Sequence, residues 1–298
     1  MTQPDRSTED DKEADNSVVG LKSAGVVGCP VEHSLSPLIH TTWARSQNLL
    51  YQYRAYNPGP NDAEFMELVK ELNEAGVSGV NVTIPFKEVA LKTADTATFA
   101  ARQIGAANML SFSDGKIIAD NSDGVGFASS VKAALDGAGV KSALVLGAGG
   151  SAKAIAYALK NEIGATNILL SNRTKAKADM IASSVNGSTI AWEERDDVAP
   201  DVDLIVNTTS VGMNADDADE PVISVSATEA AVFDIVYAPL ETPLLRHTRQ
   251  AGLRTIDGLE MLVRQAVPGF LQWSGGAQPS IRDARMVCLE TIKARQNG

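Results

Sequence analysis

The chain has 298 residues, of which 44% are hydrophobic and 21% charged, and its formal net charge is −11. This composition predicts a globular protein that is long enough for two domains. The acidic balance argues against broad electrostatic binding to nucleic acid or to an anionic membrane, although a local pocket could still bind a small anion.

Two cysteines, Cys29 and Cys288, are too few for a disulfide framework, and the absence of CxxC and HExxH spacings argues against a zinc site. The sequence contains no apolar run of bilayer length, and residues 1–20 are acidic and polar, unlike an apolar signal segment. We therefore expect a cytoplasmic protein without a metal, whose residues 1–20 form a disordered acidic tail.

The first part of the chain alternates short apolar stretches with segments of helical spacing. Ser36 is expected to cap a helix that continues to about residue 47, because Pro37 suits the first helical position, and this leaves Ser34 without a structural role. Asp62 is expected to cap the next helix. Strands are expected at 21–28, 49–56 and 77–84, a helical region up to about 103, a hairpin formed by 106–112 and 116–120 around the turn Asp114-Gly115, and a helix at 127–135.

From residue 141 strands and helices alternate regularly, which predicts a parallel sheet covered on both faces. The expected strands are 142–146, 166–171, 188–192, 203–207 and 231–237, with helices up to about 161, from 174, and at 242–251. The last segments, 258–276 and 279–296, are predicted to be helices that return to the first domain. The fold class is therefore α/β, with an N-terminal α/β domain completed by C-terminal helices and a Rossmann-type, doubly wound second domain.

A glycine loop lies between the first expected strand and helix of the second domain. Gly147, Gly149 and Ala152 fit the pattern G-x-G-x-x-A, whose small residues permit a tight turn and a close approach to a pyrophosphate at the helix N-terminus. The alternative is a glycine-rich turn without a ligand, but the strand–loop–helix context favours dinucleotide binding.

The residues after the next strand indicate which dinucleotide is bound. An NAD site normally carries Asp or Glu here, whereas this chain has Asn172, Arg173 and Thr174. A guanidinium can bind a 2′-phosphate through paired hydrogen bonds, and Lys177 adds positive charge one turn later. Arg173 could instead be a solvated residue at a helix start, but the pattern favours NADP(H) as the cofactor.

These motifs together resemble the shikimate dehydrogenase family from about residue 21 to residue 292. The matching segments are GCPVEHSLSPLIH, GVNVTIPFK, IGAAN, DNSDGVG, GAGGSA, NRT, VNTTSVGM, DIVYAPLETPLL and GLEMLVRQA. The resemblance implies reversible NADPH-dependent reduction of 3-dehydroshikimate to shikimate. It also implies a substrate-binding domain at 21–122, an NADP-binding domain at 123–258, and helices at 259–298 that return to the substrate domain.

The resemblance assigns Lys87 and Asp123 as the catalytic pair. Reduction of a ketone needs a proton donor at oxygen, which a lysine can supply while a carboxylate orients it. Taken alone, Lys87 would be a solvated surface charge and Asp123 would cap a helix beginning near Val125.

Further positions are implied to bind the substrate and the cofactor. The hydroxyls of Ser34, Ser36 and Thr83 would hold the substrate carboxylate beside a helix N-terminus. Asn81, Asn108 and Gln265 would bind ring hydroxyls, because amides both donate and accept, and Tyr237 would lie at the substrate near the nicotinamide. The implied cofactor contacts are Gly147, Ala148, Gly149, Gly150, Ser151, Asn172, Arg173, Thr174, Lys177, Ile235 and Gly258. Without the resemblance, Asn81 would be a turn residue, Gln265 a surface residue and Tyr237 a core residue.

Several alternatives stay open at this point. The chain departs from the usual family pattern at Thr41, Met109, Ser122 and Lys177, and the last of these leaves the strength of the NADP preference undecided. A quinate/shikimate or aminoshikimate dehydrogenase of the same family, or a non-enzymatic NADP-binding protein on this fold, would share most motifs. The expected partner is a small-molecule substrate, without nucleic acid or membrane, and the protein is expected to be a monomer or a homodimer.

Overall fold

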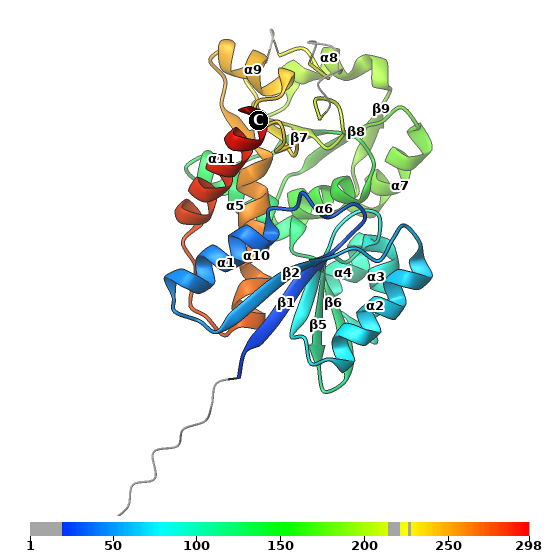
Figure 1. Cartoon of the computed structure of the whole chain (residues 1–298). Helices are drawn as coiled ribbons and strands as arrows, with labels where there is room; N and C mark the ends of the chain where they lie inside the picture. Colours follow the sequence, from blue (N-terminus) through cyan, green and yellow to red (C-terminus); the bar gives the residue numbers. More distant parts are fainter. Residues whose placement is uncertain (1–19, 214–220, 226–227, 298) are drawn as a thin grey trace, which may run out of the picture.

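The computed structural model describes residues 20–213, 221–225 and 228–297, which form two six-stranded sheets (Figure 1). Except for Gly20, the acidic tail expected over residues 1–20 lies outside the described residues. No helix in the described ranges is long and apolar enough to cross a membrane.

The first sheet has the strand order β2-β1-β3-β5-β6-β4 and is mixed. Its three N-terminal strands pair in parallel, while β5 runs antiparallel to β3 and β6. The strands are β1 (Lys22–Val27), β2 (Tyr51–Tyr56), β3 (Gly79–Val82), β4 (Thr96–Ala97), β5 (Met109–Ser113) and β6 (Lys116–Asp120). The hairpin predicted around Asp114-Gly115 is confirmed, and both turn residues have positive φ, 52° and 73°. The two-residue strand β4 was not predicted.

The helices of the first domain begin close to the predicted positions, but their caps differ. These helices are α1 (Ser36–Ser46), α2 (Asp62–Glu74), α3 (Lys87–Thr93) and α4 (Phe99–Ile104). The predicted cap of α2 at Asp62 is wrong, because the side chain of Asn61 accepts hydrogen bonds from the backbone N–H groups of Ala63 and Glu64. Asp62 is the first residue inside the helix, so its neighbour satisfies the unpaired amides of the first turn.

The second sheet is parallel throughout, with the order β12-β11-β10-β7-β8-β9. Its strands are β7 (Ser142–Leu146), β8 (Asn167–Ser171), β9 (Ser188–Ile190), β10 (Leu204–Asn207), β11 (Ala231–Asp234) and β12 (Thr255–Asp257). The helices are α5 (Asp123–Ala134), α6 (Gly150–Ala158) with a π-turn (Leu159–Ile163), α7 (Lys175–Val185), 3₁₀ turns (Trp192–Glu194 and Ala199–Asp201), α8 (Arg195–Val198) and α9 (Pro243–Gln250). The predicted doubly wound fold is confirmed. Because the strand order reverses between β7 and β10, the carboxyl ends of these strands flank the crevice in which such folds bind ligands.

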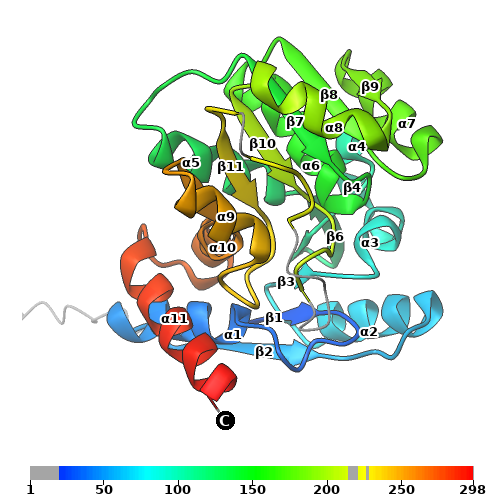
Figure 2. The same cartoon turned by 90° about the horizontal axis from the view of Figure 1, so that it is seen from above.

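The C-terminal helices α10 (Gly258–Ser274) and α11 (Ile281–Asn297) pack against the first domain. Figures 1 and 2 both show α11 beside α1, and α10 lies along α1 and α5. Trp43 and Phe270 meet edge to face inside a buried apolar cluster that also contains Cys288. Trp273 on α10 donates a hydrogen bond to Ser111 on β5 at 2.8 Å. The last two helices therefore complete the core beside the first sheet.

The cap of α2 gives a testable prediction. Asn61→Ala should lower the free energy of unfolding by about 1 kcal/mol, because two backbone amides lose their acceptor. Asp62→Ala removes only an acidic side chain in the first turn and should cost at most about 0.5 kcal/mol. Urea unfolding of the two variants beside the parent measures the difference. A larger loss for Asp62→Ala would identify Asp62 as the cap after all.

Candidate functional site

An ion pair joins the first residues of two helices, Lys87 of α3 and Asp123 of α5. Lys87 Nζ lies 2.6 Å from Asp123 Oδ2, and the two side chains are only 17% and 8% exposed. The segment before Lys87 is anchored by Phe86, which is fully buried and stacks on Phe65 at a centroid distance of 4.7 Å. The carbonyl of Lys87 accepts a hydrogen bond from the N–H of Ala107. The ammonium is therefore held by backbone and core packing as well as by its partner.

Asn108 fixes the orientation of the Asp123 carboxylate. Its Nδ2 lies 2.9 Å from Asp123 Oδ1, and also within hydrogen-bond distance of Ser122 Oγ and Gln265 Oε1. Its Oδ1 accepts a hydrogen bond from the backbone N–H of Ser122 at 2.7 Å. Asp123 thus has one oxygen on the lysine and the other on the amide, which lowers the cost of burying its charge.

The predicted ring-hydroxyl residues lie around this pair. Asn81, at 5% exposure near the end of β3, donates from Nδ2 to the Asn108 carbonyl at 3.2 Å. Gln265 reaches Asn108 from α10, where a Cβ on Gly126 of α5 would overlap the Gln265 backbone. This close approach explains the glycine, because any larger residue at 126 would push α10 away from the site. The three amides are thus brought together.

The two serines of the HSLSP segment exchange the roles predicted for them at the start of α1: Ser34, and not Ser36, has the structural role. The capping residue of α1 is Leu35, without a side-chain cap, and Ser36 already lies inside the helix, so the predicted cap at Ser36 is wrong. Ser34 Oγ instead accepts a hydrogen bond from the Ser36 N–H at 3.3 Å, so Ser34 has a structural role. Within the described part of the chain, the hydroxyls of Ser36 and Thr83 have no protein hydrogen-bond partner. They therefore remain available to an anion.

The glycine loop after β7 fits a dinucleotide. Gly147 has a φ of 105°, and a side chain there would collide with Thr208. Gly149 caps α6 without a side-chain hydrogen bond, and the positions where Gly149 and Gly150 would carry a Cβ face open space. A phosphate can therefore approach this backbone closely. It can accept hydrogen bonds from the backbone N–H groups of the first turn of α6, which includes Ser151.

The residues after β8 offer cationic and amide groups beside the loop. Asn172 Nδ2 donates to the Thr174 carbonyl at 2.9 Å, and Thr174 is the capping residue of α7. Arg173 is exposed, with its guanidinium 5.8 Å from the ring centroid of Trp192. Lys177 is exposed in the first turn of α7. A phosphate group near the end of β8 would meet positive charge and no carboxylate from the NRT segment.

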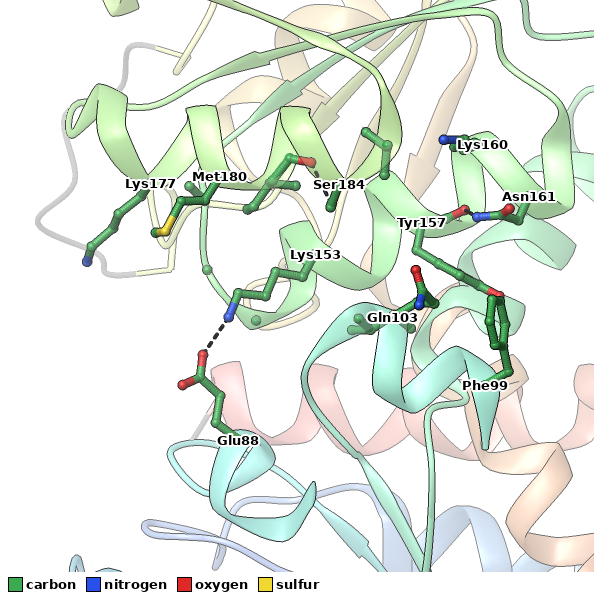
Figure 3. A pocket seen from close by; sticks show the side chains of 16 residues that line it. Glu88, Phe99, Gln103, Lys153, Tyr157, Lys160, Asn161, Lys177, Met180 and Ser184 are labelled. Atoms are coloured by element: carbon green, nitrogen blue, oxygen red, sulfur yellow. Dashed lines mark hydrogen bonds and ion pairs between the residues drawn. The ribbon is translucent and has the colours of Figure 1, made fainter. Parts of the chain in front are cut away.

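A hollow of about 490 Å³ adjoins the glycine loop (Figure 3). Helices α6 and α7 form one wall, and α3 and α4 of the first domain form the other. Across it, Lys153 Nζ lies 2.6 Å from Glu88 Oε1, and this hydrogen bond lowers the pKa of the Glu88 carboxyl. Neither Lys87 nor Asp123 lines the hollow, which adjoins the glycine loop instead.

The loop after β11 is held by a buried carboxylate that the sequence did not single out. Asp234 accepts hydrogen bonds from Asn207 Nδ2, the Val236 N–H and the Thr242 hydroxyl, and burial raises its pKa to about 6. A Cβ on Gly258 would overlap the carbonyl of Ile235, so the close approach of these two segments requires glycine.

Tyr237, three residues after Asp234, is half-buried against the apolar cluster of α1, α10 and α11. Burial raises the pKa of its hydroxyl, which therefore stays protonated at neutral pH. Two further polar residues escaped the sequence analysis. Asn121 accepts from the Asp123 N–H at 3.1 Å, and Tyr53 donates to Asn81 Oδ1 at 2.7 Å. Asn121 could have been found as the amide of the DNSDG motif, whereas Tyr53 lies in no motif.

Comparisons with known proteins agree over most of the chain. Residues 26–110 match the family described as shikimate dehydrogenase substrate binding domain, and residues 129–261 match the family described as shikimate / quinate 5-dehydrogenase. A shikimate dehydrogenase (NADP(+)) from Methylobacterium radiotolerans is 42% identical over 275 residues, covering 89% of this chain and 96% of the relative.

Solved structures show the same similarity. The shikimate 5-dehydrogenase of Thermus thermophilus, in complex with NADP(H) and shikimate, has a TM-score of 0.79 and 33% identity, over 89% of this chain and 97% of its own. A quinate dehydrogenase from Corynebacterium glutamicum in complex with NAD has a TM-score of 0.83 at 28% identity, over 90% of this chain and 99% of its own. The fold alone therefore does not separate these two activities.

The network around Asn108 predicts a large stability loss on truncation. Asn108→Ala should lower the free energy of unfolding by about 2–3 kcal/mol, because the buried Ser122 N–H and the Asp123 carboxylate lose partners. Asn73→Ala is the control, since its partly exposed side chain only donates to the Gly115 carbonyl, and it should cost about 0.5 kcal/mol or less. Denaturant unfolding tests both, and equal losses would show that the network contributes nothing beyond a surface bond.

Proposed function

The chain belongs to the shikimate dehydrogenase family and is an NADP-linked oxidoreductase, and from this premise we propose that Lys87 and Asp123 catalyse the reversible reduction of 3-dehydroshikimate to shikimate. The observation that carries the proposal is the 2.6 Å ion pair, which lies among three buried amides. This places a proton donor beside groups able to bind a polyhydroxylated ring.

We propose that hydroxyls and amides of the first domain position the substrate. Ser34, Ser36 and Thr83 would bind its carboxylate, and the hydroxyls of Ser36 and Thr83, unused by the described chain, support this role. Asn81, Asn108 and Gln265 would bind the ring hydroxyls, and Tyr237 would contact the substrate beside the nicotinamide. A ketone held by several fixed contacts presents its carbonyl in one orientation, which is a large part of the rate advantage.

The reduced nicotinamide, when bound, supplies the hydride that adds to the ketone carbon. Negative charge then grows on the ketone oxygen, and Lys87 Nζ stabilises that charge and donates a proton to it. Asp123 holds the ammonium in place through Oδ2 while Asn108 holds Oδ1. In the oxidation of shikimate the neutral Lys87 amine accepts the hydroxyl proton. At 17% exposure the lysine side chain can exchange its proton with solvent between turnovers.

The cofactor-binding residues are proposed on the fit of the loop described above. The loop of Gly147, Ala148, Gly149, Gly150 and Ser151, whose backbone is open at Gly149 and Gly150, suits the pyrophosphate. The proposed contacts with the 2′-phosphate are Asn172, Arg173, Thr174 and Lys177, and those with the nicotinamide are Ile235 and Gly258.

The organisation of the protein follows from the same proposal. We propose domain boundaries after residue 122 and after residue 258. The start of α5 at Asp123 supports the first boundary, and the start of α10 at Gly258 lies within one residue of the second. We further propose a cytoplasmic protein that acts as a monomer or homodimer on a small-molecule substrate.

Quinate oxidation is the second candidate, because a quinate dehydrogenase with NAD has the same fold. If this chain acted like that enzyme, it would have to bind NAD. Arg173, however, stands where an NAD site normally carries an acidic residue that binds the ribose 2′-hydroxyl. Assays of the purified chain with shikimate, quinate and aminoshikimate, each with NADP⁺ and NAD⁺, decide between these. Failure of all six combinations would favour a non-enzymatic NADP-binding protein, against which the Lys87–Asp123 pair argues.

Lys87→Met tests the catalytic role. The substitution keeps the apolar stem and removes the ammonium, so both KM values should change little while kcat falls by about 10²–10⁴. Lys92→Met, on the exposed end of the same helix, is the matched control and should leave kcat unchanged. Turnover within about threefold of the parent in Lys87→Met would mean that another group moves the proton.

Arg173→Ala tests cofactor selection. Only NADP⁺ offers a 2′-phosphate to the guanidinium, so KM for NADP⁺ should rise about 10–100-fold while KM for NAD⁺ stays within about twofold. Lys175→Ala is the control, because its ammonium is already paired with Asp179 at 2.7 Å. Equal weakening of both cofactors in Arg173→Ala would contradict the assignment.

A further inference from the structure

Tyr53 lies in the core of the first domain, yet its hydroxyl reaches the proposed substrate site. The residue is 6% exposed, and its ring stacks on His40 with centroids 3.8 Å apart and planes inclined by 20°. The hydroxyl donates to Asn81 Oδ1 at 2.7 Å. Tyr53 is thus connected to the site through a side chain rather than through the backbone.

The hydroxyl of Tyr53 acts as a donor under all ordinary conditions. Burial raises its pKa well above the usual value, so it stays protonated. Burial also lowers the pKa of His40 to about 3, so the ring beneath Tyr53 is neutral. The other group near this ring is Tyr51, whose pKa burial raises as well. The two titratable rings beside Tyr53 are therefore neutral at neutral pH.

Two fixed partners determine which way the Asn81 amide faces. Its oxygen accepts from Tyr53, and its nitrogen donates to the Asn108 carbonyl at 3.2 Å. A flipped amide would set oxygen against the Asn108 carbonyl, an unfavourable contact of two acceptors. This arrangement leaves one N–H of Asn81 unused by these two bonds.

We propose that Tyr53 is a positioning residue for substrate binding, which orients the Asn81 amide so that its remaining N–H donates to a ring hydroxyl oxygen of the substrate. This inference rests on the proposed function, in which Asn81 binds the ring. Tyr53 itself is not assigned any contact with substrate. It acts by keeping the Asn81 oxygen occupied and the amide nitrogen available.

The same strand provides a matched control. Tyr51, two residues earlier on β2, is also largely buried near His40, and its hydroxyl lies 3.1 Å from His40 Nδ1. Tyr51→Phe and Tyr53→Phe therefore remove the same atom from the same strand. Only the second removes a bond to Asn81.

The test compares steady-state kinetics of shikimate oxidation in Tyr53→Phe, Tyr51→Phe, Asn81→Ala and the double variant Tyr53→Phe/Asn81→Ala. Tyr53→Phe should raise KM for shikimate about 3–10-fold, with KM for NADP⁺ unchanged and kcat within about threefold, since one hydrogen bond is lost. Tyr51→Phe should leave all three constants within about twofold. In the Asn81→Ala background, Tyr53→Phe should add no further loss, because the group that it orients is gone.

Thermal unfolding of both phenylalanine variants separates a folding defect from a binding defect. Asn81→Asp provides a second test that leaves Tyr53 intact: it keeps an acceptor for the tyrosine but cannot donate, so KM for shikimate should rise. Equal effects of the two Tyr→Phe changes, multiplicative effects in the double variant, or an unchanged KM in Asn81→Asp would each overturn the positioning role. An inactive parent chain would overturn the proposed function itself, a result distinct from an active parent with these outcomes.

Discussion

The candidate site depends on one ion pair, which lies where the two domains meet. Lys87 is the first residue of α3 in the first domain, and Asp123 begins the helix that leads into the second. Breaking a largely buried ion pair costs far more than the pair itself contributes, because one charge is left without a partner. Asn108 reduces this cost for the carboxylate, because its Nδ2 donates a hydrogen bond to Asp123 Oδ1. Removing the amide or one member of the pair therefore lowers the free energy of unfolding, because a buried charge loses a partner.

The sequence was a good guide where a pattern extends over many residues. The regular alternation after residue 141 predicted the parallel sheet, and the Asp114-Gly115 turn predicted the hairpin. The strands β4 and β12 were missed because two and three residues are too few to show periodicity. Caps were misassigned because Asn61 and Asp62, like Ser34 and Ser36, are all good capping residues. Which of them caps depends on the backbone path, which residue type does not reveal.

Site residues inside motifs were named from the resemblance, and the structure brings Asn81, Asn108 and Gln265 together around Lys87 and Asp123. Residues that support the site from outside the motifs were not found. Tyr53 and Tyr51 share one face of β2, since alternate residues of a strand point the same way. The alternation in YQY thus places the two rings on one face but cannot tell which hydroxyl meets an amide 28 positions after Tyr53. Asp234 lies inside the DIVYAPLETPLL segment, but residue type does not reveal that its carboxylate accepts from Asn207 of the neighbouring strand as well as from its own segment.

The return of the last helices to the first domain determines the order in which the protein can be completed. Trp43 donates to the carbonyl of Ser280, and Arg295 donates to the carbonyl of His33, across 237 and 262 positions of sequence. The strands of the second sheet, by contrast, are contiguous in the chain, from Ser142 to Asp257. During synthesis from the N-terminus, all strands of the second sheet are therefore made before α10 and α11, the helices that close the first core. The N-terminal domain is the last to finish, and until then the apolar face around Trp43 has no cover from its own chain.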